Sequence, residues 1–215
     1  MATNTQKPTV RDLVSEGAHA ISRSRAIDHW MPALSKYDAE ELMAAILDTE
    51  LTPALRRSRI TPAQQRRFES MIARRVGGEP VAQITGRFVF RELELEVQRD
   101  VFAPRASSEL LAGEAIAFLR RRREPRVAVD VATGSGPMAL ALANEVSSAT
   151  VWGLDISPAA VALARRNARR VGVRNARFRV SDLLAALPRS LNEGVDLFTM
   201  HPPYVARHEI RTLPR

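Results

Sequence analysis

The chain has 215 residues, no cysteine and a net charge of +8, and its hydrophobic fraction of 45% is enough for a buried core. The lack of cysteine excludes disulfides, thiolate metal sites and a cysteine nucleophile. No segment approaches the roughly 18 apolar residues of a membrane span, and the N-terminal residues lack signal-peptide features, so we expect a cytoplasmic protein without membrane contact.

Nearly all of the positive charge is arginine, since lysine occurs only at positions 7 and 36. The densest cluster, Arg120–Arg123 with Arg126, precedes an apolar segment, where a solvated linker is the commoner interpretation. We therefore treat the basic charge as weak evidence and do not expect a nucleic-acid partner.

Residues 1–78 are predicted to form a small helical domain. Thr9 with Asp12, and Thr61 with Gln64, have the spacing of capping boxes, and each pair predicts the start of a helix. A further helix is predicted to open at Asp38, because apolar residues recur after it at helical spacing. The helix that begins at Thr61 should end at the glycine pair 77–78.

Residues 79–105 are predicted to form a β-hairpin linker. In the segment RFVFRELELEVQRDVF, Leu93, Leu95 and Val97 alternate with glutamates, which is typical of a half-buried strand pair. We expect this hairpin to connect two domains.

Residues 106–215 are predicted to form an α/β domain. A helical pattern over 107–122 is followed by short apolar segments near 126–132, 150–155, 176–181 and 195–200, which alternate with further helical patterns. This alternation indicates βαβ units around a parallel sheet, the Rossmann-like class.

The segment VAVDVATGSG places a strand, Asp130 and a glycine turn in front of a helix. Gly134 and Gly136 would let a ligand approach the backbone at the N-terminus of that helix. Asp155 ends the next strand, where its carboxylate can accept hydrogen bonds from ribose hydroxyls, and Asp182 follows the third strand beside the expected position of an adenine. The spacing favours S-adenosylmethionine (SAM) over a dinucleotide.

The fourth strand leads into His201, Pro202, Pro203 and Tyr204. With this motif, the chain resembles the HemK/PrmC family of SAM-dependent methyltransferases, which modify a glutamine side-chain amide in peptide-chain release factors. The resemblance rests on the segments 78–90, 101–110, 130–136, 154–172, 181–184 and the final HPPY.

The resemblance implies a cofactor site and an adjoining substrate site. The expected cofactor contacts are Asp130, Ala132, Thr133, Gly134, Ser135, Gly136, Asp155, Ile156, Asp182, Leu183 and His201. The expected catalytic residues are His201, Pro202 and Tyr204, and Arg105, Pro203 and Tyr204 are the expected substrate contacts. No metal is expected, because the four histidines lack ligand spacing with one another.

Three departures from the family pattern concern the acceptor. His201 stands where the family has asparagine, Ala132 where it has glycine, and the family segment PRPxTE is PRASSE at 104–109. Neutral histidine has one donor and one acceptor on opposite sides of its ring, so it does not reproduce the paired groups of asparagine. It could instead be a general base for a hydroxyl or amine.

These observations leave alternatives beside the release-factor glutamine. They are a methyltransferase for a small-molecule hydroxyl or amine, an inactive SAM-binding or interaction protein, and a nucleic-acid methyltransferase. The family continues beyond the HPPY motif for several strands, whereas this sequence ends at Arg215. We therefore expect an incomplete sheet, with a partner chain or a missing C-terminal segment to cover its edge.

Overall fold

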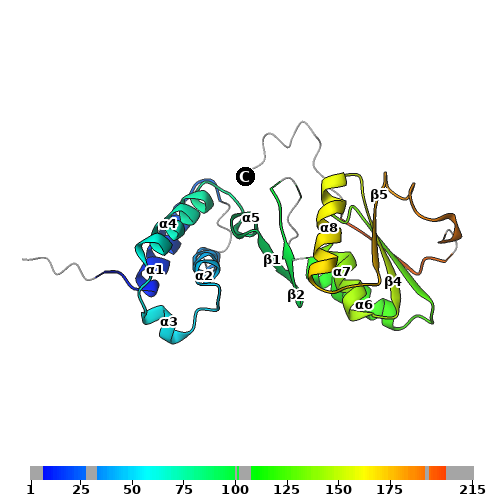
Figure 1. The fold of residues 1–215 in the computed structure, drawn as a ribbon, viewed down its shortest axis with the longest axis horizontal. Helices are drawn as coiled ribbons and strands as arrows, with labels where there is room; N and C mark the ends of the chain where they lie inside the picture. Colours follow the sequence, from blue (N-terminus) through cyan, green and yellow to red (C-terminus); the bar gives the residue numbers. More distant parts are fainter. Residues whose placement is uncertain (1–6, 28–32, 100, 102–107, 192–193, 202–215) are drawn as a thin grey trace, which may run out of the picture. The chain divides into compact units, whose positions relative to one another are not determined.

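A computed structural model describes residues 7–27, 33–99, 101, 108–191 and 194–201, which belong to two compact units that meet in the sequence between Thr85 and Gly86 (Figure 1). The first unit is helical. Its elements are α1 (Val10–Ser22), α2 (Leu34–Leu47), α3 (Pro53–Arg57), α4 (Pro62–Val76) and α5 (Val81–Thr85). Gly17 lets α1 approach α4 closely, since an added Cβ would lie 2.8 Å from Ile72 Cδ1.

Side-chain caps fix two of these helices where the sequence predicts them. Both capping boxes form, with Thr9 and Asp12 at α1 and with Thr61 and Gln64 at α4, and α4 ends at a Gly77 cap as predicted.

The predicted start of α2 is wrong. The helix begins at Leu34 after an Ala33 cap that makes no side-chain hydrogen bond, and Asp38 lies inside the first turns. The Asp38 carboxylate instead pairs with Arg75 of α4 at 2.7 Å. The sequence at Asp38 resembles a helix start because aspartate is a preferred N-cap residue. Only the contact with Arg75 shows that Asp38 lies inside the helix.

The second unit begins with the predicted antiparallel hairpin, β1 (Arg87–Phe90) and β2 (Leu93–Glu96). The expected alternation is confirmed, because Leu93, Leu95 and Val97 are all buried. Phe90, Leu93 and Leu95 join one hydrophobic cluster with the helices of this unit.

A four-stranded parallel sheet forms the rest of the second unit. Its elements are α6 (Ser108–Arg120), β3 (Arg126–Val131), α7 (Pro137–Glu145), β4 (Ala149–Asp155), α8 (Pro158–Arg170), β5 (Ala176–Val180), the short 3₁₀ helix η1 (Arg189–Leu191) and β6 (Leu197–Met200). The strand order is β5-β4-β3-β6. All four strands lie within two residues of their predicted bounds, and the predicted α/β class is confirmed.

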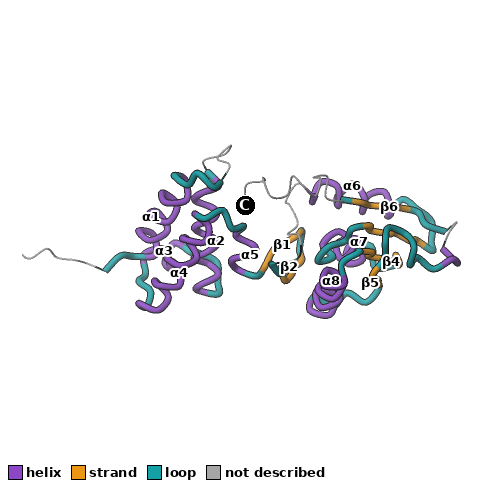
Figure 2. Tube along the Cα trace, turned by 90° about the horizontal axis from the view of Figure 1, so that it is seen from above, coloured by secondary structure: helices purple, strands orange, loops and turns teal. Residues whose placement is uncertain are grey.

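Different elements cover the two faces of the sheet. Ala128 and Val151 pack in the cluster that contains α6, α7 and α8, and these helices lie on one side of the sheet (Figures 1 and 2). On the other face, Val129 and Trp152 pack with residues of the segment that leads to β6, including Leu187.

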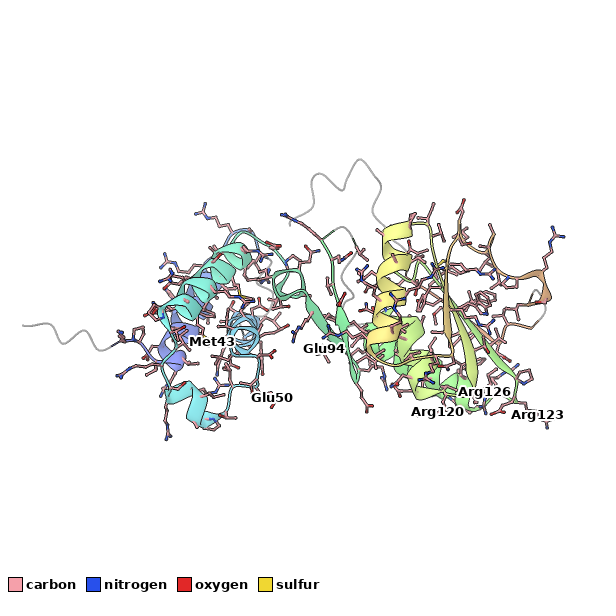
Figure 3. All side chains as sticks on the ribbon, viewed as in Figure 1. Met43, Glu50, Glu94, Arg120, Arg123 and Arg126 are labelled. Carbon is pink, nitrogen blue, oxygen red and sulfur yellow. The ribbon has the colours of Figure 1, made fainter. Side chains whose placement is uncertain are left out.

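The arginine cluster lies where α6 ends and β3 begins, the amino-terminal edge of the sheet (Figure 3). Arg120 pairs with Glu145, Arg122 with Asp196 and Arg126 with Glu124, at 3.0 to 3.6 Å. These intramolecular partners account for much of the cluster's charge within the fold. Within the described part of the chain, no helix is both long and apolar enough to cross a membrane.

Candidate functional site

Parallel strands place the loops that follow them at one edge of the sheet. In the second unit, the glycine loop 132–136 follows β3, Asp155 ends β4, Asp182 follows β5 and His201 follows β6. The residues predicted from four separate sequence segments are therefore brought to the same carboxyl-terminal edge.

The glycine loop turns through three left-handed residues. Ala132 has φ 58°, Gly134 has φ 57° and Gly136 has φ 89°. An added Cβ at Gly136 would also lie 3.1 Å from Ala164 Cβ and 3.2 Å from Phe178 Cε1, so both backbone angle and packing require glycine there. Ala132 takes this conformation at a steric cost that the family's glycine avoids.

Asp155 holds the loop in place through its carboxylate. One oxygen accepts from the Gly134 N–H at 2.8 Å and the other from the Ser157 N–H at 2.9 Å. A carboxylate has about four acceptor positions, so half of them remain for hydroxyl donors of a ligand. Ile156, the next residue, is exposed.

Asp130 is the buried carboxylate beneath the loop. Its two oxygens accept from Thr133 Oγ1 at 2.6 Å and from Thr199 Oγ1 at 2.8 Å. Burial, opposed by these hydrogen bonds, raises the pKa of Asp130 to about 6, and Asp155 adds to the rise. Thr133 and Thr199 are themselves buried, so this network anchors β3, the loop and β6 to one another.

The raised pKa predicts how stability depends on pH. Because the pKa of Asp130 is about 6 in the fold against an ordinary 3.8, the folded chain binds more protons than the unfolded chain between these values. The contribution of Asp130 to the free energy of unfolding should therefore fall by up to about 3 kcal/mol as the pH rises from about 4 to about 7. Urea unfolding of the native chain and of Asp130→Asn across this range should show that difference, and a constant difference would contradict the assignment.

The turn after β5 is held by Ser181 and leaves Asp182 exposed. Ser181 Oγ donates to the Leu183 carbonyl at 2.8 Å and accepts from the Ala186 N–H at 2.9 Å. Leu183 has φ 45° and an exposed side chain. Asp182 and Leu183 thus stand at the edge of the sheet, available to a ligand.

His201 is exposed at the end of β6, and its Nδ1 lies 3.3 Å from Ser108 Oγ at the start of α6. This contact joins two of the segments that depart from the family pattern. Arg105, Pro202, Pro203 and Tyr204, also predicted for the site, lie outside the described residues.

The described residues fit SAM by three local features. The loop provides a glycine turn where a Cβ would clash, and the Asp155 carboxylate faces it. The Ser135 hydroxyl is fully buried and has no hydrogen-bond partner among the described residues. Across that same part of the chain, no group of three acidic, histidine or cysteine side chains could hold a metal ion.

Three residues that hold the glycine loop and Asp130 in place were not predicted from the sequence. Thr199 reaches Asp130 from a neighbouring strand, Gly153 leaves space beside the loop, and Asn167 of α8 hydrogen-bonds the Ser135 carbonyl at 2.9 Å. Two of them carried a usable signal, because a glycine inside an apolar strand and an asparagine on the apolar face of a helix both require an explanation.

Family comparisons agree with this architecture. A family model described as the PrmC N-terminal domain matches residues 33–86, and one described as a methyltransferase domain matches residues 125–209. Among solved structures, a SAM-dependent methyltransferase from Agrobacterium tumefaciens is 17% identical with a TM-score of 0.47, and it covers 56% of this chain and 40% of that one.

Curated relatives are closer. The release factor glutamine methyltransferase of Burkholderia pseudomallei is 38% identical over 183 residues, which cover 82% of this chain and 63% of that protein. The Streptomyces coelicolor protein of the same description is 42% identical over 143 residues, covering 65% and 48%. The chain spans about half to two thirds of the length of such relatives. Both domain matches and these identities make the chain similar to the HemK/PrmC family of SAM-dependent methyltransferases.

Proposed function

We propose that the chain transfers a methyl group from SAM to the side-chain amide of a glutamine in a peptide-chain release factor. The observation that carries this proposal is the gathering of the glycine loop, Asp155, Asp182 and His201 at one edge of the parallel sheet. The identity to release factor glutamine methyltransferases supports the same acceptor. A substrate that serves translation also places the reaction in the cytoplasm.

In this proposal, some of the site residues bind the cofactor and others bind the acceptor. Asp155 and the glycine loop would hold SAM, which would supply an electrophilic methyl group on a sulfonium. Asp182 and Leu183 would border the adenine, and Pro202, Pro203, Tyr204 and Arg105 would contact the acceptor. An amide nitrogen is a poor nucleophile because its lone pair is delocalised, so catalysis depends on orienting it for in-line attack.

His201 is the group that orients the acceptor in this proposal. His201 Nδ1 lies 3.3 Å from Ser108 Oγ, and the tautomer decides which ring nitrogen donates and which accepts. A primary amide presents a donor and an acceptor, and a single ring nitrogen can satisfy one of them. The amide is therefore held less firmly than an asparagine would hold it.

Replacing His201 with asparagine should raise glutamine methylation about 10-fold, because one additional hydrogen bond to the amide is worth about 1.4 kcal/mol. The test is transfer of labelled methyl from SAM to a purified release factor, with a release factor that lacks the acceptor glutamine as control. Native transfer that depends on this glutamine supports the proposal. Loss of transfer in His201→Asn would show that the histidine is itself adapted to the acceptor.

A second candidate function is methylation of a small-molecule hydroxyl or amine. It is favoured by the contact between His201 and Ser108, since a hydroxyl that fixes the imidazole is the arrangement of a general base. This candidate expects no transfer to the release factor, and transfer to hydroxyl or amine acceptors that is lost in His201→Ala. SAM binding without transfer to any acceptor would indicate a binding protein.

A further inference from the structure

Asn167 lies in α8 and is completely buried, yet its amide makes three hydrogen bonds to backbone far away in the sequence. Its Oδ1 accepts from the Glu96 N–H at 2.8 Å, and its Nδ2 donates to the Glu96 carbonyl at 3.2 Å. The same Nδ2 donates to the Ser135 carbonyl at 2.9 Å. One side chain therefore joins the end of the hairpin to the glycine loop.

The bond to Ser135 fixes the peptide group that leads into α7. At one end of this group, the Ser135 oxygen accepts from Asn167, and at the other end, the Gly136 N–H donates to the Thr133 carbonyl at 2.9 Å. Gly136 is also the residue with φ 89° that caps α7. With both ends held, the peptide plane has one orientation, which fixes the turn of the glycine loop into α7.

Other contacts between the hairpin and α8 lack this specificity. Glu96 lies 3.5 Å from Arg166 and 3.6 Å from Arg170, and these side chains are more than a third exposed. Exposed ion pairs of this kind contribute little and tolerate many geometries. Asn167 is the buried connection, and its donors and acceptor are all used.

We propose that Asn167 is a positioning residue for SAM, which holds the glycine loop in its binding conformation and couples it to the hairpin. This inference rests on the proposed SAM site. It gives the hairpin a role in cofactor affinity, although β1 and β2 contribute none of the predicted cofactor contacts.

The first test compares Asn167→Asp with Asn175→Asp. Both replacements keep the side-chain shape and remove Nδ2. Asn175 donates to the Ala143 and Ala149 carbonyls at 2.9 Å, at the amino-terminal edge of the sheet opposite the site. Calorimetric titration with SAM, at a temperature where circular dichroism shows each variant folded, should give about 10-fold weaker binding for Asn167→Asp and less than about a 2-fold change for Asn175→Asp.

A second test needs no variant and remains valid if Asn167→Asp does not fold. Coupling is reciprocal, so SAM should slow hydrogen exchange of the Glu96 N–H by at least about 5-fold. The Val97 N–H, which donates to the Gly86 carbonyl within the hairpin, is the matched control and should change much less. Equal protection of both amides, or equal SAM affinity in the native chain and Asn167→Asp, overturns this inference alone. A native chain that does not bind SAM overturns the proposed function as well.

Discussion

Replacing Asp155 with alanine should weaken SAM binding about 100-fold, which corresponds to about 2.7 kcal/mol. The carboxylate is expected to accept hydrogen bonds from ribose hydroxyls, and charged acceptors make the stronger hydrogen bonds. It also accepts from the Gly134 and Ser157 N–H groups, so its loss releases the loop. Calorimetric titration with SAM measures the change directly.

Asp196→Ala is the matched control for Asp155→Ala. Asp196 also binds a backbone amide, the Val127 N–H at 2.9 Å, and it pairs with Arg122 at the opposite edge of the sheet. Its replacement should lower the free energy of unfolding by about 1 to 2 kcal/mol and leave SAM affinity unchanged. Similar affinity losses in both variants would mean that Asp155 acts through general stability rather than through the ligand.

Replacing Gly153 with alanine should lower the free energy of unfolding by about 3 kcal/mol. Gly153 lies in β4 between Asp130 and Phe178 of the neighbouring strands. An added Cβ would lie 2.4 Å from Phe178 Cδ1 and 3.0 Å from Thr133 Oγ1, and both of these side chains are buried. The ring and the loop must both shift to admit the methyl group.

Gly113→Ala should instead raise the free energy of unfolding. Gly113 lies in α6, and an added Cβ would have only Arg91 Nη1 within 4 Å, at 3.7 Å, so this variant should gain about 0.5 to 1 kcal/mol from helix propensity. Urea unfolding of both variants measures the contrast. A Phe178→Leu change should recover part of the Gly153→Ala loss, and purely additive effects in the double variant would contradict the steric account.

Much of the fold could be predicted because it depends on local patterns. The strand β3 is an apolar segment with a carboxylate near its end, and the capping boxes at Thr9 and Thr61 are complete within four residues. Asp38 shows where this approach fails, since its partner Arg75 lies 37 residues away in another helix.

The expected cofactor contacts of the candidate site could be predicted from the sequence, but the residues that hold them in place could not. Gly134, Gly136 and Asp155 are recognised from spacing along the chain, and parallel strands then bring them to one edge. The bonds from Asn167 to Ser135 and from Ser108 to His201 span 32 and 93 residues, so neither follows from local sequence.

Titration of the native chain with SAM and with its demethylated product shows whether this edge of the sheet binds SAM. We expect saturable binding of both compounds at one site, accompanied by a rise in the unfolding temperature. Absence of heat and of any thermal shift at millimolar concentrations of either compound would contradict it.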